Sequence, residues 1–249
     1  MNTKMKLIAI ISVLLGGIAF TAGAQKNSFS IGGHAGVNIS KLCCGSMEIN
    51  DDYKFGEGPA FGVTAAYGVG KYISIAAELN YTTMGGKKNG MQAVTGYGSN
   101  GNSVLYADFD NKTVLNYLEL PVMARVTFGN KFKYYANLGV FGSYLLAAKN
   151  ETSGNSALYA DKNGSRKYAE SVLSFNSDTD IKKQVKDFNF GLVGGLGAGY
   201  TFGRHGIWLD GRYALGMPNI RENTNVNGEN STGSIMATLG YTFTINAGK

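Results

Sequence analysis

Strict alternation of apolar and polar residues is the feature that most constrains the fold of this 249-residue chain. Eight segments carry an apolar side chain at every second position, a pattern typical of strands with one apolar and one polar face. Glycine occupies 36 positions and proline only 3, which fits a strand-rich chain and argues against a helical bundle. We therefore predict strands over residues 29–39, 61–69, 73–81, 118–128, 134–144, 188–200, 207–215 and 235–243.

The connections between these segments alternate between short and long. Tight turns are expected at 68–71, 129–132 and 203–206, and the last of them is expected to pair Phe202 with Ile207. Neighbouring strands then run antiparallel, and closing the sheet leaves no long unpaired edge. The sequence predicts an all-β fold, an eight-stranded antiparallel up-and-down transmembrane β-barrel, with long polar loops at one rim over 40–58, 84–113, 148–185 and 218–231.

Composition of the polar face indicates which side of the barrel meets lipid. Small residues such as Gly195 and Gly197 on that face suit the crowded interior of an eight-stranded barrel. Aromatic residues ten positions apart on the apolar face, such as Tyr134 and Tyr144, match the height of a lipid-facing band. The alternative is a soluble ligand-binding barrel, since Gly206-Ile207-Trp208 is similar to the lipocalin G-x-W motif, although it lies near the C-terminus rather than on the first strand.

The N-terminal residues predict export. Lys4 and Lys6 precede an apolar run over 7–20 and the small-residue site Ala22-Gly23-Ala24, which is typical of a secretory signal peptide. We expect 1–24 to be cleaved and 25–249 to form an outer-membrane β-barrel domain in the bacterial outer membrane. The net charge of +6 includes no cluster of lysine and arginine, so nucleic acid is not an expected partner.

Charged residues on the polar face are few, and buried charges must be paired. From the expected turn, Arg212 would face Gly197 and Asp210 would face Gly199, leaving room for the arginine to cross the lumen. We interpret this set as a plug of salt bridges; a proton or ion path through the same groups is the alternative. The predicted barrel-interior charge network consists of Glu78, Glu119, Arg125, Asp210 and Arg212.

Enzyme chemistry is not predicted. His34 has Gly36 two positions on, so it lacks the His-x-Ser pattern of outer-membrane lipid deacylases, and His205 falls in a short turn. No catalytic residue, metal site or cofactor is expected, and the adjacent Cys43 and Cys44 leave their redox state open. A lipid-modifying enzyme remains the third reading of function.

Two of the long loops contain a repeat of eight residues that differs at one position. Residues 101–108 read GNSVLYAD and residues 154–161 read GNSALYAD. Local packing of a duplicated loop tip is one reading. The other is a small extracellular platform, in which the two copies touch and have matching local structure, with Tyr106 and Tyr159 as adjacent recognition residues.

Two further stretches resemble a known family. Residues 117–122 (YLELPV) and 209–213 (LDGRY), followed by Gly216 and Asn219-Ile220, are similar to the PorT-like outer-membrane β-barrel family across essentially the whole mature chain. The resemblance implies a barrel in outer-membrane lipid, folding by the barrel-assembly machinery and, in some members, a role in protein secretion. We expect a non-enzymatic barrel whose long loops bind an extracellular ligand, or an accessory protein of envelope secretion.

Overall fold

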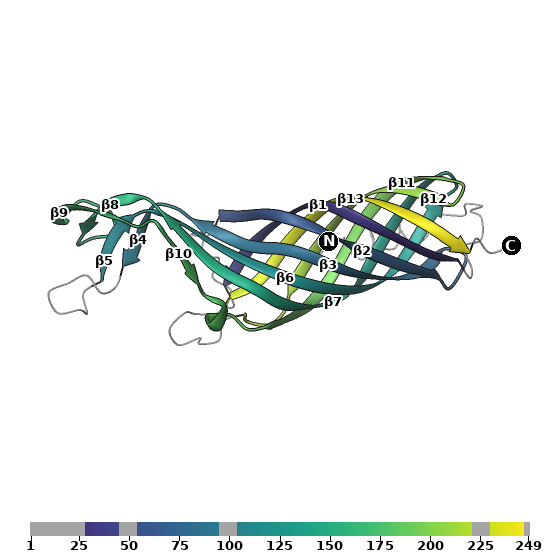
Figure 1. Cartoon of the computed structure of the whole chain (residues 1–249), viewed down its shortest axis with the longest axis horizontal. Helices are drawn as coiled ribbons and strands as arrows, with labels where there is room; N and C mark the ends of the chain where they lie inside the picture. Colours follow the sequence, from purple (N-terminus) through teal and green to yellow (C-terminus); the bar gives the residue numbers. More distant parts are fainter. Residues whose placement is uncertain (1–27, 45–53, 95–103, 221–229, 247–249) are drawn as a thin grey trace, which may run out of the picture.

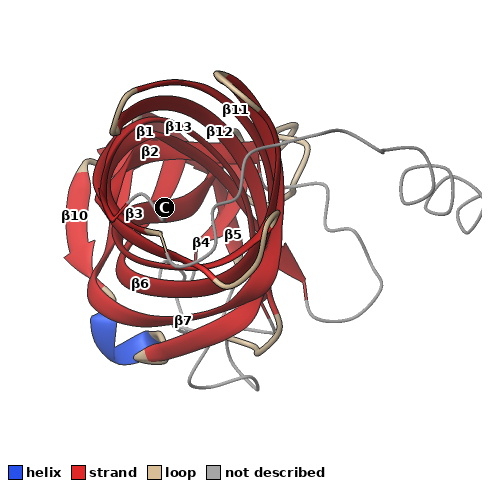
Figure 2. Ribbon diagram, turned by 90° about the vertical axis from the view of Figure 1, so that its right-hand side faces the viewer, coloured by secondary structure: helices blue, strands red, loops and turns tan. Residues whose placement is uncertain are grey.

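Eight long antiparallel strands close into a barrel, which confirms the predicted fold class. The computed structural model describes residues 28–44, 54–94, 104–220 and 230–246, so the expected signal peptide lies outside the described residues. Around the ring the order is β7-β11-β12-β13-β1-β2-β3-β6, and β6 pairs with β7 to close it (Figure 2). The barrel strands are β1 (Phe29–Cys44), β2 (Lys54–Gly68), β3 (Ile73–Lys88), β6 (Asp110–Gly129), β7 (Phe132–Ser153), β11 (Phe188–Phe202), β12 (His205–Gly216) and β13 (Asn230–Asn246).

Two of the predicted long loops are in large part strands, so that part of the loop prediction is wrong. The strands β3, β6 and β7 run on past the barrel rim, and a second sheet of order β4-β5-β8-β9 lies at the far end of these extensions (Figure 1). Three strands of this sheet are only four or five residues long, too short for an alternating pattern to be recognised, and the sequence pattern therefore missed them. The added elements are β4 (Met91–Val94), β5 (Leu105–Asp108), β8 (Asn155–Tyr159), β9 (Lys167–Ser174), β10 (Ser177–Asp180), which pairs with β7, and the 3₁₀ helix η1 (Lys182–Gln184).

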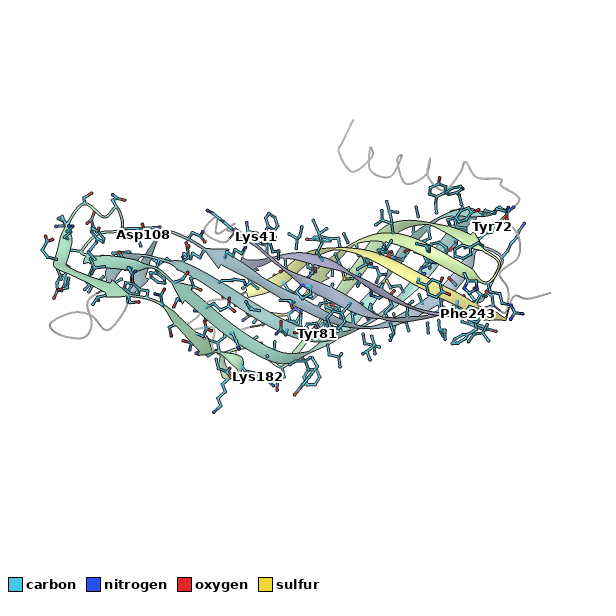
Figure 3. The ribbon with its side chains drawn as sticks, turned by 45° about the horizontal axis from the view of Figure 1, so that its top comes forward. Lys41, Tyr72, Tyr81, Asp108, Lys182 and Phe243 are labelled. Carbon is cyan, nitrogen blue, oxygen red and sulfur yellow. The ribbon has the colours of Figure 1, made fainter. Side chains whose placement is uncertain are left out.

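The outer wall of the barrel is an apolar band between two sets of aromatic rings. Leu138 and Leu196 are 69% and 71% exposed, as lipid-facing side chains of a barrel must be. Tyr81 marks the band near the middle of the molecule, and Tyr72 and Phe243 mark its short-turn end (Figure 3). Ring contacts at the first level are Phe61–Tyr81 at 5.0 Å and Tyr144–Phe188 at 5.2 Å, and at the second Tyr72–Phe128 at 5.9 Å and Phe132–Tyr200 at 4.9 Å.

The lumen is filled by side chains in layers. At the long-loop rim an apolar plug closes it, to which Ile181 and Val185, on either side of η1, contribute from the chain between β7 and β11. Charged residues and a small apolar cluster of Met123, Phe141 and Val193 lie deeper. No helix within the described ranges is long and apolar enough to cross a bilayer. The apolar plug consists of Leu42, Met84, Leu115, Tyr117, Leu145, Ala148, Ile181, Val185 and Ile220.

The turn between β11 and β12 is tighter than the sequence suggested, which corrects the predicted register. Phe202 pairs with His205 rather than with Ile207. Gly203 has a φ of +62°, a left-handed conformation that glycine adopts freely, and such a residue permits a two-residue hairpin turn. All facing pairs therefore shift by two positions: Arg212 faces Gly195 instead of Gly197, and Asp210 faces Gly197 instead of Gly199.

Candidate functional site

An ion pair that spans the lumen lies at the centre of the barrel. Arg212 on β12 donates to both carboxylate oxygens of Glu78 on β3, with Nη2 to Oε1 at 2.9 Å. The strands β12 and β3 are four places apart in a ring of eight, so the pair joins opposite walls. Arg212 Nε also donates to Asp210, two residues away on the same face. A Cβ on Gly195 would stand 2.8 Å from Arg212 Cγ, so the glycine leaves space for the arginine side chain.

Neutral partners complete the hydrogen bonds of these carboxylates. The Tyr135 hydroxyl donates to Asp210 Oδ2 at 2.5 Å, and Asn80 Nδ2 donates to Glu78 Oε2 at 3.2 Å. Arg125 lies 3.7 Å from Glu78 and stacks over the Tyr135 ring at 4.3 Å. Sequence reasoning missed Tyr135 and Asn80, yet both occupy inward positions of their strands, which was the signal that could have found them.

Glu119 does not join the other four residues of the predicted network. Its side chain is only 3% exposed, and Oε2 has no hydrogen-bond partner among the described residues. It faces Asn80 across the β3–β6 pair, one strand away from the ion pair it was expected to enter. The alternating pattern correctly places Glu119 on the inner face, but it carries no information on how far a side chain reaches across a lumen.

The two histidines occupy different environments. His34 Nε2 lies inside the barrel, 3.8 Å from Glu78, and His205 Nδ1 lies 2.5 Å from the Tyr241 hydroxyl at the short-turn rim. Cys43 and Cys44 end β1, and their side chains lie outside the described part of the structure. Within the residues that the structure describes, no group of three or more histidine, cysteine, aspartate or glutamate side chains is arranged to hold a metal ion.

The repeated octapeptides meet in the second sheet, β4-β5-β8-β9. Tyr106 of β5 and Tyr159 of β8 are direct antiparallel partners, so the predicted contact between the two copies is confirmed. Directly opposed residues lie on the same side of a sheet. Ala93 pairs with Tyr106 and Lys167 pairs with Tyr159, which places a row of four side chains across β4, β5, β8 and β9 on one face. We call this row, Ala93-Tyr106-Tyr159-Lys167, the tyrosine row.

The opposite face of this sheet has an apolar core of its own. Leu105, Ala107 and Leu158 are buried together there, and Phe109 stacks on Phe175 with ring centroids 4.9 Å apart. In addition, the backbone N–H of Asp108 donates to the Ser156 hydroxyl at 2.9 Å, which joins the two repeats a second time. The tyrosine row is therefore held on a packed sheet rather than on an open loop.

The repeats differ in local structure at their aspartates. Asp108 is the last residue of β5, whereas Asp161 follows β8 and closes the turn to β9 by accepting the N–H groups of Arg166 at 2.7 Å and Ser165 at 3.2 Å. The prediction of matching structure therefore holds at the leucine and the tyrosine and is wrong after them, because Ala107 and Asp108 continue β5 whereas β8 ends at Tyr159. It is also wrong before them, because Val104 is exposed and precedes β5 whereas Ala157 is buried within β8. Residues 101–103 of the first copy lie outside the described residues. The hydrogen bond from Arg166 is the main cause of the lowered pKa of Asp161.

The chain is similar to several solved structures of outer-membrane barrels. No curated protein sequence matches the chain. Solved structures that are similar include the N-terminal β-barrel domain of Pseudomonas aeruginosa OprF (12% identity, TM-score 0.38, covering 88% of this chain and 98% of that one) and OprG of the same organism (14%, 0.39, 90% and 99%). Another is Ail, the attachment invasion locus protein of Yersinia pestis (13%, 0.38, 88% and 99%). The model of the outer membrane protein beta-barrel domain family matches residues 23–222, and the chain therefore belongs to this family of bacterial outer-membrane barrels.

Proposed function

We propose that this protein is a non-enzymatic outer-membrane barrel whose extracellular sheet is a binding surface for a macromolecule. The single observation that carries the proposal is the tyrosine row, with Tyr106 and Tyr159 side by side on a sheet that has its own core. Tyrosine supplies a large contact area at little cost in side-chain entropy and is enriched among residues that dominate binding energy. Both rings are half-buried, which leaves one side of each for a partner.

The position of the sheet supports the same proposal. From Tyr144 at the edge of the apolar band, β7 continues to Ser153, which is roughly 30 Å along the strand at ~3.3 Å per residue. The sheet therefore stands clear of the lipid headgroups, where a soluble partner can reach it. The lumen is closed by the apolar plug and crossed by the Arg212–Glu78 pair, which argues against a channel as the main activity.

Export, lipid and assembly partners belong to the same proposal. We infer that residues 1–24 are the signal peptide that directs the chain across the inner membrane, that the apolar outer wall contacts outer-membrane lipid, and that the barrel-assembly machinery inserts it. The placement of His34 against Glu78 and of His205 at the opposite rim from the sheet supports the absence of a hydrolytic site.

Site-specific photocrosslinking in living cells tests the binding surface and requires no assumption about the identity of the partner. A photoreactive residue at position 106 or 159 is expected to give a discrete adduct, whereas the same residue at Lys131, in the turn at the other rim, gives none of that size. Changing the remaining tyrosine to alanine should abolish the adduct. Identical adducts from all three positions, or none from 106 and 159, would contradict the proposal.

A role as an accessory protein of envelope secretion is the second candidate. It is favoured by the resemblance of residues 117–122, which lie on β6 with Glu119 and Pro121 turned into the lumen, to PorT-like barrels. Deleting the gene and measuring protein in the culture medium tests it. If the wild-type gene restores secretion and the Tyr106→Ala/Tyr159→Ala variant does not, the binding surface acts in secretion and the two candidate functions are one. Unchanged secretion after deletion would eliminate the second candidate.

A further inference from the structure

The short-turn end of the lumen contains a polar cavity that the proposed function does not use. Its volume is about 110 Å³, which is room for more than one water molecule. Gly68, at the end of β2, and Gly203, in the β11–β12 turn, are among its lining residues, so the cavity lies at the rim that faces the periplasm in outer-membrane barrels. We call it the periplasmic vestibule.

The lining of the vestibule is cationic and rich in hydroxyl groups. Arg125 and Lys133 contribute positive charge, and eight serine and threonine side chains surround them, while no aspartate or glutamate is among the lining residues that the structure describes. Lys133 stands between two glycines, Gly129 and Gly199, on the neighbouring strands. None of the ion pairs within the described ranges includes Lys133. Two positive charges therefore share a small volume without an acid to balance Lys133.

Unpartnered donors at the floor of the vestibule indicate the chemistry that would complete it. Arg125 Nε is buried and has no acceptor among the described residues, and neither has the buried Thr64 hydroxyl. A guanidinium N–H can only donate, so the missing partner is an acceptor. Leaving a buried charged donor without an acceptor is costly. A water molecule would satisfy the hydrogen bond, but it would leave the charge of Lys133 unbalanced.

We propose that the periplasmic vestibule binds a small oxyanion of the phosphate class, with Arg125 and Lys133 as the cationic ligands and Thr64 as a hydroxyl donor. Phosphate offers acceptor oxygens in several directions and the negative charge that the lining lacks. Arg125 lies 3.7 Å from Glu78 and over the Tyr135 ring, and Glu78 is already bound by Arg212, so Arg125 can donate into the vestibule without breaking the central ion pair. This proposal is independent of the extracellular binding surface.

The only tryptophan of the chain provides a direct probe. Trp208 lines the vestibule and donates through Nε1 to Thr242 Oγ1 at 2.7 Å. The purified full-length protein in an uncharged detergent would be titrated with inorganic phosphate at constant ionic strength, and in a second arm with glycerol 3-phosphate. A saturable change in Trp208 fluorescence is expected. If both compounds bind, free phosphate is enough to occupy the vestibule. If only glycerol 3-phosphate binds, the natural ligand is the phosphate of a lipid headgroup.

Matched variants separate site binding from a general ionic effect. Lys133→Gln should weaken binding about tenfold, the worth of one charge-assisted hydrogen bond. Lys133→Arg should retain it. Lys131→Gln, the same change at an exposed lysine two residues away outside the vestibule, should leave binding unaltered. Folding of each variant is checked by its change in gel mobility on heating. A response that does not saturate, that chloride reproduces, or that is equal in Lys133→Gln and wild type would overturn the proposal.

Discussion

Arg212 is the residue on which the interior ion pairs depend, because it contacts two of the three buried carboxylates of the network, Glu78 and Asp210. Glu78 is 3% exposed and Asp210 is 5% exposed, and each accepts a hydrogen bond from the same guanidinium. A buried ion pair adds little compared with an apolar replacement, but removing one partner leaves charge without compensation. Loss of Arg212 alone is therefore expected to destabilise the fold more than replacement of the whole ion pair by apolar residues would.

We predict that Arg212→Ala lowers the free energy of unfolding by roughly 3–5 kcal/mol, because Glu78 and Asp210 would remain buried without their cation. Urea titration of the protein refolded into lipid vesicles measures this. Arg204→Ala, at an exposed arginine in the two-residue turn, is the matched control and should change stability little. Equal midpoints for the two variants would mean that water reaches Arg212.

A second residue-scale prediction concerns the glycine opposite Asp210. A Cβ on Gly197 would come within 2.2 Å of Tyr135 Cζ, so Gly197→Ala should displace the ring and its hydrogen bond to Asp210. We expect a loss of about 1–3 kcal/mol, the usual cost of overpacking. Gly211→Ala, where the nearest atom is 4.0 Å away, should be close to neutral in the same urea assay. Equal stability of the two variants would show that Tyr135 has room to move.

The inward residues of each strand could be predicted from the sequence, but their partners could not. Alternation assigns Glu78, Glu119 and Arg212 to the inner face because direction depends only on odd or even position. Which inward residues pair with one another depends on the register between strands and on how far each side chain extends across the lumen. A turn two residues tighter than expected moved Arg212 from Gly197 to Gly195, and Glu119 was left outside the ion pairs.

At the scale of elements, the turn between β8 and β9 supports the tyrosine row. Gly164 in this turn has a φ of +69°, and its Cβ position lies 3.8 Å from the Tyr159 ring, so the turn packs beside that ring. Asp161 holds the turn through the N–H groups of Ser165 and Arg166. The geometry of the binding surface therefore depends on an ionised carboxylate outside the membrane.

We predict that acid loosens this turn. The hydrogen bond from the Arg166 N–H lowers the pKa of Asp161 below its ordinary value, so the contribution of the carboxylate is present at neutral pH and is lost as pH falls through that lowered pKa. Amide chemical shifts of Ser165 and Arg166, followed by NMR during acid titration, measure the change. In Asp161→Asn these shifts should lose their dependence on pH. A transition at the ordinary pKa in the wild type would contradict the role of the hydrogen bond.

The lipid-facing strands could be predicted from the sequence, whereas the extracellular sheet could not. Segments such as 134–144 must alternate because one face meets lipid and the other the lumen. In β9 and β10, nearly every residue is at least partly exposed on both faces, so no alternation arises. The repeated octapeptide was the one signal there: it predicted that its two copies touch, as Tyr106 and Tyr159 do, but not that they form strands.

For the whole molecule, the order of layers along the lumen determines permeability. The apolar plug fills the lumen at the long-loop end, with Tyr117 and Leu145 completely buried, the ion pairs cross the middle, and the vestibule lies at the short-turn end. Ile181 and Val185 in the plug come from a long connection, and nothing in a period-two pattern identifies such residues as lumen-filling. The alternating pattern therefore does not predict that the connection between β7 and β11 helps to close this end of the lumen.

We predict no stable large conductance when the purified protein is inserted in planar bilayers, because an eight-stranded barrel of this kind is filled by side chains. In cells the protein should fractionate with outer membranes, and the purified preparation should change its gel mobility on boiling, which shows that the protein used for the recording is folded. Current steps of the size of a porin's would refute the plug. A soluble periplasmic pool with one mobility at all temperatures would refute the lipid-facing wall.

The separate cores of barrel and extracellular sheet have a consequence for how the protein can evolve. Leu105, Ala107 and Leu158 pack among themselves and with neighbours in their own sheet, apart from the residues that fill the lumen. Substitutions on the tyrosine row need no compensating change in the barrel, and the barrel can keep the features required for insertion while the sheet diversifies. Substitutions in residues 91–108 and 155–174 can therefore be selected with little cost to insertion of the barrel. We expect the sequences of related strains to differ most in these two ranges.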